Sequence, residues 1–297
     1  MFDYHIHTTI RDGVHSIEEN VEYAIFKGLN EIGISEHFGI LPDDWENYMK
    51  NIDMYEPEWE ELKLKKTAPF SMRGALFRYF NFIDLAKEKY KDQIIVKKGL
   101  EMDLYRSNYK KSFDLVKSFK PDYIIGSIHA FDQIGFHNFP TYKTVTSEDY
   151  KKLLNELIFF VKNDCMNILG HFNLYKCFID FGDEKEFYPL YEELILACKE
   201  HNVVPEVNTG LFGGKFIMDP NMFFLKTCGK YDVPVMISSD AHNKYNIADS
   251  YKIMFPYLKK AGIKYTAKWI DCKAEIREID YDRALGFKWF PQYFVVW

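Results

Sequence analysis

The sequence has few of the features that mark secreted, membrane-spanning or disulfide-bonded proteins. Its five cysteines are widely spaced and form no CxxC pair, which argues against a disulfide framework or a zinc ribbon and favours reduced thiols. There is no apolar run of about eighteen residues to span a bilayer. The N-terminal stretch MFDYHIHTT has neither the basic nor the apolar region of a signal peptide. We therefore expect a cytoplasmic protein with no membrane contact.

The chain has a net negative charge and lacks a cluster of basic residues. The net charge is −6, from 38 Lys and Arg against 44 Asp and Glu, and the basic residues form no stripe along the chain. This predicts no general nucleic-acid binding, which depends on neutralising phosphates. An enzyme that handles phosphate on such an acidic surface must gather positive charge locally, from metal ions or a few basic side chains.

Short apolar runs alternate with amphipathic stretches over most of the 297 residues. Strands are predicted at 2–7, 31–35, 94–96 running into 99–101, 122–127, 167–170, 203–207 and 233–238. Helices are predicted at 16–27, 149–162, 187–201 and 221–231. Strands that alternate with helices favour βαβ units and a parallel sheet, and so many of them predict an α/β barrel or a distorted barrel.

Residues 1–267 are expected to form one barrel domain, since α/β barrels reach this size as single units. Two segments fit the alternation of strands and helices poorly. Within the domain, residues 41–80 are rich in Trp, Tyr, Glu and Lys and are predicted to form a lid or helical excursion. The aromatic-rich extension 268–297 is expected to pack on the barrel or to form a homo-oligomer interface.

Side chains that can bind metals recur at the ends of the predicted strands. His5 and His7 lie at i and i+2 of the first strand, so they share one face and can reach one ion. Further strand ends carry Glu36 and His37, Glu101, His129, His171, and Asp240 with His242. The carboxyl ends of the strands in a parallel barrel converge on one face. The pattern therefore predicts a single multi-metal centre.

The types of ligand narrow the chemistry. Many imidazoles with a few carboxylates and no clustered thiols suit zinc, manganese or iron. The candidate ligands are too many for one ion, so we expect two or three divalent ions, with Glu101 bridging two of them. Such clusters generate hydroxide at neutral pH and clamp both oxygens of an in-line displacement at phosphorus. We expect a phosphatase that hydrolyses a small phosphomonoester by means of a metal-bridging hydroxide.

At these residues the sequence resembles the polymerase-and-histidinol-phosphatase (PHP) superfamily. Seven motifs occur in order, namely HIHT, DG, SEH, GLE, GSIH, GH and SDAH. The stretches GLEMDLY, PDYIIGSIHAFD, ILGHFNLYK and PEVNTGLF are most similar to the histidinol-phosphate phosphatases. The resemblance covers residues 1–265, and the tail beyond lies outside it.

The resemblance implies a distorted (β/α)7 barrel with a trinuclear site at the C-terminal end of its strands. It implies one ion on His5, His7, Glu101 and Asp240, a second on Glu101, His129 and His171, and a third on Asp12, His37 and His242. It also implies hydrolysis of histidinol phosphate to histidinol and phosphate, a step of histidine biosynthesis. Another small phosphomonoester, from nucleotide or secondary metabolism, is the alternative. A nuclease and a non-catalytic metal-binding module are more distant ones.

Several assignments stay open on the sequence alone. His15 competes with Asp12 as the ligand in the first loop. Catalytic roles are assigned to Asp12, Glu101 and His242, and Asp12 is the candidate to protonate the leaving alkoxide. Lys176, Arg73 and Arg78 are the candidate phosphate-binding residues. Glu36 is a candidate to orient a liganding imidazole, and His201 is expected to be inert.

The segments TTIRDGVHS, Phe136–His137 and Asn173 depart from the usual histidinol-phosphate phosphatase pattern. These departures leave the metal ligands intact. They concern the pocket that selects the alcohol, so the reaction is better determined than the substrate.

Overall fold

The computed structural model describes residues 1–39, 72–131, 134–135, 146–172, 184–210 and 222–287. Its strands are β1 (Phe2–Asp3), β2 (Glu31–Ile34), β3 (His37–Phe38), β4 (Ile95–Lys98), β5 (Glu101–Asp103), β6 (Ile125–Ser127), β7 (Ala130–Phe131), β8 (Ile134–Gly135), β9 (Ile168–Leu169), β10 (Val204–Asn208), β11 (Met236–Ser238), β12 (Tyr265–Ile270) and β13 (Lys273–Glu278). Its helices are α1 (Ile17–Phe26), α4 (Met72–Lys89), α5 (Tyr109–Lys117), α6 (Ser147–Val161), α7 (Tyr188–Glu200), α8 (Met222–Lys230), α9 (Tyr251–Ala261) and α10 (Tyr281–Gly286), with short 3-10 helices η3 (Glu184–Phe187) and η5 (Lys244–Asn246).

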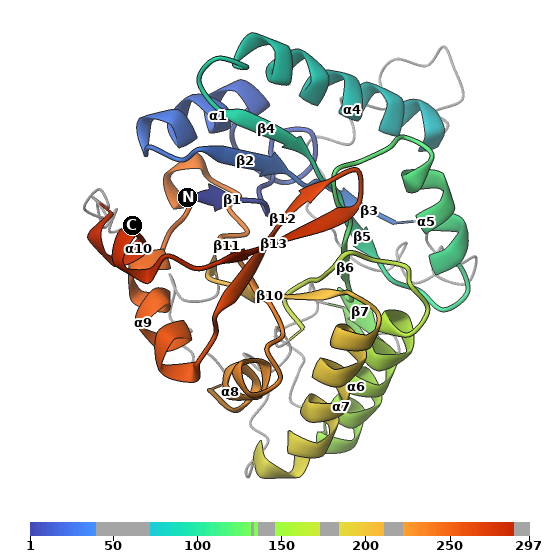
Figure 1. Ribbon diagram of the computed structural model, residues 1–297. Coiled ribbons are helices and arrows are strands. Elements are labelled where there is room, and N and C mark those ends of the chain that lie inside the picture. The colour runs from blue at the N-terminus through green and yellow to red at the C-terminus, as the bar shows by residue number, and fades with distance from the viewer. Residues whose placement is uncertain (40–71, 132–133, 136–145, 173–183, 211–221, 288–297) are drawn as a thin grey trace.

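The fold is a mixed α/β arrangement in which most strands are parallel and the helices lie around their outside (Figure 1). One sheet has the order β1-β2-β4, and a second has the order β11-β10-β9-β6-β5-β3. Every neighbouring pair in both sheets is parallel. The predicted parallel α/β class is therefore confirmed. None of the described helices is long and apolar enough to cross a membrane.

The two sheets are not joined into a closed barrel by continuous strand pairing within the described residues. A single isolated parallel bridge, Ile6 to Ala241, links the end of the first predicted strand to the segment after β11. The predicted strand 2–7 pairs as a strand only over Phe2–Asp3. One reason is local: the backbone N–H of Ile6 donates to the Ser35 side-chain oxygen (3.1 Å) instead of to a backbone carbonyl.

The first helix begins where the sequence predicts. The Ser16 side chain accepts the backbone N–H of Glu19, and the Glu19 carboxylate accepts that of Ser16, forming a capping box. Ile17, Val21 and Ala24 bury one face of α1 in the core. This fixes the loop that joins the first strand to α1, which carries two of the candidate ligands.

The C-terminal region contains structure that the sequence pattern did not predict. Strands β12 and β13 form an antiparallel hairpin that crosses the centre of the view in Figure 1. Trp269 of this hairpin is buried against Tyr4 and Tyr123, among other interior residues. The backbone N–H of Cys272 donates to the Asp122 carbonyl (2.8 Å), just before β6. The hairpin thus covers the amino ends of the parallel strands and leaves the carboxyl ends to the candidate site.

Parts of two predicted segments lie outside the described residues. These are 41–71 of the predicted lid and 288–297 of the aromatic extension. The remainder of the lid segment is the first half of α4, and the domain boundary predicted after residue 267 falls inside β12.

Candidate metal centre

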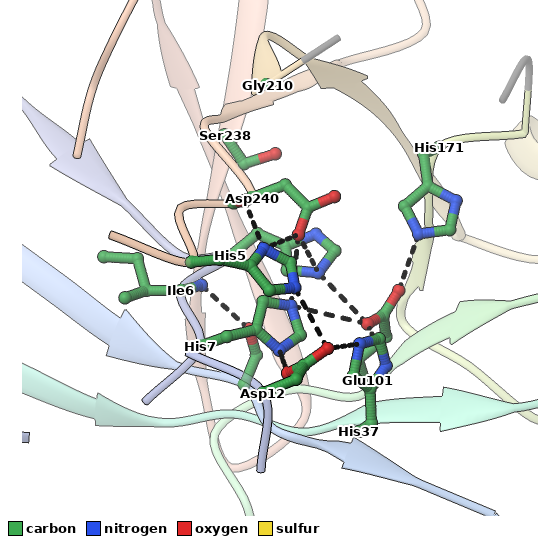
Figure 2. Close-up of polar contacts among 12 residues, drawn as sticks. His5, Ile6, His7, Asp12, His37, Glu101, His171, Gly210, Ser238 and Asp240 are labelled. Carbon is green, nitrogen blue, oxygen red and sulfur yellow. Dashed lines mark hydrogen bonds and ion pairs between the residues drawn. The ribbon is translucent and has the colours of Figure 1, made fainter. Parts of the chain in front are cut away.

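All nine predicted metal ligands come together on the side of the sheets at which β2, β4, β6, β9 and β11 end, and Figure 2 shows most of them. They fall into four overlapping groups whose ligand atoms lie within 4.8 Å of one another. The groups are His7, Asp12, His37 and His242; His5, His171 and Asp240; His5, His7 and Glu101; and His37, Glu101 and His129. Residues from all along the chain therefore converge on one place, as the spacing of the motifs predicts.

The first predicted strand and the segment after β11 form one side of the cluster. The Nε2 atoms of His5 and His7 lie 3.4 Å and 3.1 Å from Oδ1 of Asp240. Both imidazoles are fully buried. Asp240 has a positive φ of 52°, a conformation that is uncommon for a residue other than glycine and that often marks functional sites.

Glu101 lies at the centre of the cluster, and its two oxygens face different imidazoles (Figure 2). Its Oε2 is 2.8 Å from His37 Nδ1, and its Oε1 is 2.7 Å from His171 Nε2 and 3.3 Å from His129 Nε2. A fully buried carboxylate with two such faces has the geometry needed to bridge two ions.

Asp12, rather than His15, enters the cluster. The Asp12 Oδ2 atom lies 3.2 Å from His242 Nε2 and 3.3 Å from His37 Nε2. The His15 ring points elsewhere: its Nδ1 accepts the backbone N–H of Lys244 at 3.3 Å. Of the two first-loop candidates, the geometry therefore favours Asp12 over His15 as the residue that belongs to the cluster.

Several cluster atoms are buried without a hydrogen-bond partner. Within the described part of the chain these include His5 Nε2, both ring nitrogens of His7 and Glu101 Oε2. Leaving one such buried polar atom unsatisfied costs about 1–3 kcal/mol. Four of them in one cluster of nitrogen and oxygen donors are difficult to explain as packing alone. The residues fit divalent metal ions, for which imidazole and carboxylate are common ligands.

The imidazoles and carboxylates of the cluster shift one another's pKa values. Burial raises the pKa of Glu101, but the imidazoles of His37, His5 and His129 hold that pKa well below its usual range. Burial, together with the nearby His37, lowers the pKa of His7 to about 3. An ionised carboxylate and a neutral imidazole are the forms that coordinate metals. Despite their burial, nearby carboxylates raise the pKa of His5, His37 and His129, so a metal that binds these imidazoles would displace protons from them.

Asp12 is held in its ionised form. Burial favours its neutral carboxyl, but hydrogen bonds from His242 and His37 keep the pKa of Asp12 well below its usual range. An ionised carboxylate can accept a proton or bind a metal but cannot donate a proton. This arrangement favours Asp12 as a ligand over Asp12 as the acid that protonates the leaving group.

A second layer of side chains holds the ligands, and the sequence analysis missed most of it. Nδ1 of His129 contacts Asp103 Oδ1. Nδ1 of His5 lies 2.6 Å from Glu206 Oε1, and Asn208 Nδ2 donates to Asp240 Oδ2 at 2.9 Å. The sequence feature that could have indicated Glu206 and Asn208 is their spacing: they lie two residues apart, in and just after the apolar run 203–207.

Glu36 was expected to orient a liganding imidazole, but its carboxylate bonds elsewhere. Its Oε1 accepts both the backbone N–H (2.7 Å) and the hydroxyl of Thr8. It thereby ties the loop after His7 to the strand that carries His37.

The remaining candidates are placed as follows. Arg73 and Arg78 are exposed on α4, and the Arg73 guanidinium lies 5.5 Å from the centroid of the Phe119 ring. Lys176 lies outside the described residues, as do Asn173 and residues 136–137. His201 ends α7 and contacts Asp164 at 2.9 Å, apart from the four groups.

The chain is similar to known proteins over most of its length. Residues 3–210 match the PHP domain family. A protein of Schizosaccharomyces pombe named as a probable histidinol-phosphatase is 24% identical over 266 residues, covering 83% of this chain and 81% of the relative. The histidinol-phosphatase of Lactococcus lactis subsp. lactis is 26% identical over 289 residues, covering 92% and 96%.

A solved structure shares the fold. The histidinol phosphate phosphatase of Lactococcus lactis, in complex with zinc, L-histidinol and phosphate, superposes with a TM-score of 0.70 at 22% identity. The superposition covers 92% of this chain and 98% of that one.

Proposed function

The chain belongs to the PHP domain family, and from this premise we propose that it is a metal-dependent phosphatase that hydrolyses a small phosphomonoester. The observation that carries the proposal is the convergence of nine metal-capable side chains on one partly buried cluster around Glu101. Four buried nitrogen and oxygen atoms of the cluster that lack a hydrogen-bond partner in the described part of the chain also support it.

We propose that three divalent ions, zinc, manganese or iron, occupy the cluster in a distorted (β/α)7 barrel. The first would be held by His5, His7, Glu101 and Asp240, the second by Glu101, His129 and His171, and the third by Asp12, His37 and His242. The group of His5, His7 and Glu101 supports the first set, and the group that contains Asp12, His37 and His242 supports the third, whereas the other two groups join ligands of different sets. The bridge between Ile6 and Ala241 supports a barrel that is incompletely closed between β1 and β11.

The chain's own residues set the geometry of the reaction. Bound ions would supply positive charge and lower the pKa of a bound water. Glu101 holds its two oxygens toward different imidazoles, so it would be able to serve more than one ion. Asp12 and His242 have side chains 49% and 41% exposed, so they lie at the open edge of the cluster, where a substrate phosphate can enter.

We propose histidinol phosphate as the substrate, with histidinol and phosphate as products. The names of the relatives support this choice. The structure of the Lactococcus lactis enzyme, which contains zinc, L-histidinol and phosphate, supports it as well. Another small phosphomonoester is the alternative. The net charge of −6 does not favour a nuclease.

A phosphate-release screen tests the proposal. The zinc- or manganese-loaded protein is assayed against a panel of phosphomonoesters that includes histidinol phosphate, with a phosphodiester beside them. We expect release from monoesters, fastest from histidinol phosphate. Faster release from another ester would replace the substrate, and cleavage of the diester alone would overturn the monoesterase proposal.

A further inference from the structure

β10 differs from the other strands that end at the cluster, because it supplies none of the predicted ligands. All five of its residues are buried. Their side chains alternate between the two faces of the strand. Val207 belongs to the large hydrophobic core that includes the helices, and Val204 packs in a separate cluster with Tyr4 and Trp269. Glu206 and Asn208 share the inward face with Val204. Two polar side chains on a buried face need a specific reason to be there.

Glu206 uses both of its oxygens to hold ligand-bearing segments. Oε1 lies 2.6 Å from His5 Nδ1 and also accepts the Ser238 hydroxyl. Oε2 accepts the backbone N–H of His171 at 2.6 Å. A carboxylate oxygen accepts hydrogen bonds, so Nδ1 of His5 is the ring nitrogen placed to donate to Glu206. The other ring nitrogen, Nε2, is then left facing Glu101 (3.3 Å).

Asn208 does the same for the carboxylate of Asp240. Its Nδ2 donates to Asp240 Oδ2 at 2.9 Å, and its Oδ1 accepts the backbone N–H of Gly210 at 2.9 Å. Because both ends of the amide are engaged, its orientation is fixed. Oδ1 of Asp240 is thereby left toward His5 and His7.

We propose that β10 is the positioning strand of the metal centre, and that Glu206 and Asn208 orient His5, His171 and Asp240 without binding an ion themselves. Both oxygens of Glu206 already accept hydrogen bonds, and Glu206 belongs to none of the groups of ligand atoms found in the described part of the chain. Both ends of the Asn208 amide are likewise engaged. This inference rests on the proposed function, since it concerns the same centre. Residues that orient ligands in this way typically change metal affinity 10- to 100-fold when substituted.

The test measures zinc affinity on the full chain, stripped of metal and titrated in competition with a fluorescent chelator. Glu206→Gln keeps the size of the side chain but has one acceptor oxygen, so it cannot serve both His5 and the His171 backbone. We expect its zinc dissociation constant to rise about 10- to 100-fold. Asn208→Ala should weaken zinc binding in the same direction, because the Asp240 carboxylate loses its donor.

Val207→Ala is the matched control, because it alters the same strand on the opposite face. It should lower the melting temperature of the metal-free protein and leave the zinc dissociation constant unchanged. The inference is supported if zinc affinity falls in Glu206→Gln and Asn208→Ala but not in the control. If Glu206→Gln fails to fold, Asn208→Ala decides the question by itself.

Two results would overturn the inference. Wild-type zinc affinity in a folded Glu206→Gln protein would show that Glu206 does not position ligands. Equal weakening in Val207→Ala would show a general effect of destabilising β10. In both cases the wild-type protein still binds zinc, so the proposed function survives. A wild-type protein that binds neither zinc nor manganese would overturn both.

Discussion

His37 and Glu101 are register partners in the parallel pair β3–β5, and His37 Nδ1 lies 2.8 Å from Glu101 Oε2. Strand pairing thus sets the two side chains beside each other at the start of these short strands. Glu101 is fully buried there. A carboxylate in this position stays ionised because imidazoles surround it, and it is the residue on which most of the cluster depends.

Glu101→Gln should lose most of its bound metal. The substitution keeps the shape of the side chain but removes the charge and one of the two ligand oxygens. We expect the metal content of the purified protein, measured by inductively coupled plasma mass spectrometry, to fall clearly below wild type. His201→Gln, which alters a histidine outside the cluster, should retain the wild-type content. Equal contents in the two variants would exclude a bridging role for Glu101.

Asp12→Ala and His15→Ala should differ in metal content. Asp12 contacts His37 and His242, whereas His15 accepts a backbone N–H from Lys244. We expect Asp12→Ala to bind fewer ions per chain and His15→Ala to bind as many as wild type. The reverse order in a titration of bound zinc would assign the first-loop ligand to His15.

Removal of metal should destabilise the folded protein. Ions that bind only the native state add to its stability. Without them, His5 Nε2, both ring nitrogens of His7 and Glu101 Oε2 are buried with no hydrogen-bond partner among the described residues. We expect a chelator to lower the melting temperature in calorimetry, and added zinc or manganese to restore it. An unchanged melting temperature would argue that these atoms do not bind metal.

Trp269→Ala should destabilise the fold without altering the metal ligands. Trp269 is 1% exposed and packs with Tyr4 and Tyr123 at the end opposite the cluster. Loss of so large a buried side chain typically costs about 3–5 kcal/mol. Chemical denaturation measures the change, and Ile270→Ala, at a side chain 46% exposed, should have little effect. A near-neutral Trp269→Ala would mean that the hairpin is not part of the core.

The sequence was sufficient to predict which side chains come together, because most of them lie at the end of an apolar run that reads as a strand or just after one. His5, Glu101 and Asp240 are recognisable in this way before any contact is known. The capping box of Ser16 and Glu19 is equally local, and it set the start of α1 correctly.

The positioning residues and the hairpin could not be predicted in the same way. Glu206 and His5 are 201 positions apart, and only the tertiary fold shows that their side chains meet. The burial of Trp269 against Tyr4 likewise depends on where the chain returns after α9. The ends of the strands were predicted less well, because backbone pairing between strands depends on residues distant in sequence. Ser35 is an example: its side-chain oxygen accepts the backbone N–H of Ile6 in place of a backbone carbonyl.

The most direct test of the proposed function is the rate of phosphate release from histidinol phosphate by metal-loaded wild-type protein and by Glu101→Gln under the same conditions. We expect steady release by the wild type and a loss on the order of 100-fold or more in the variant, because the cluster proposed to activate water is disrupted. Release by Glu101→Gln at the wild-type rate would contradict it.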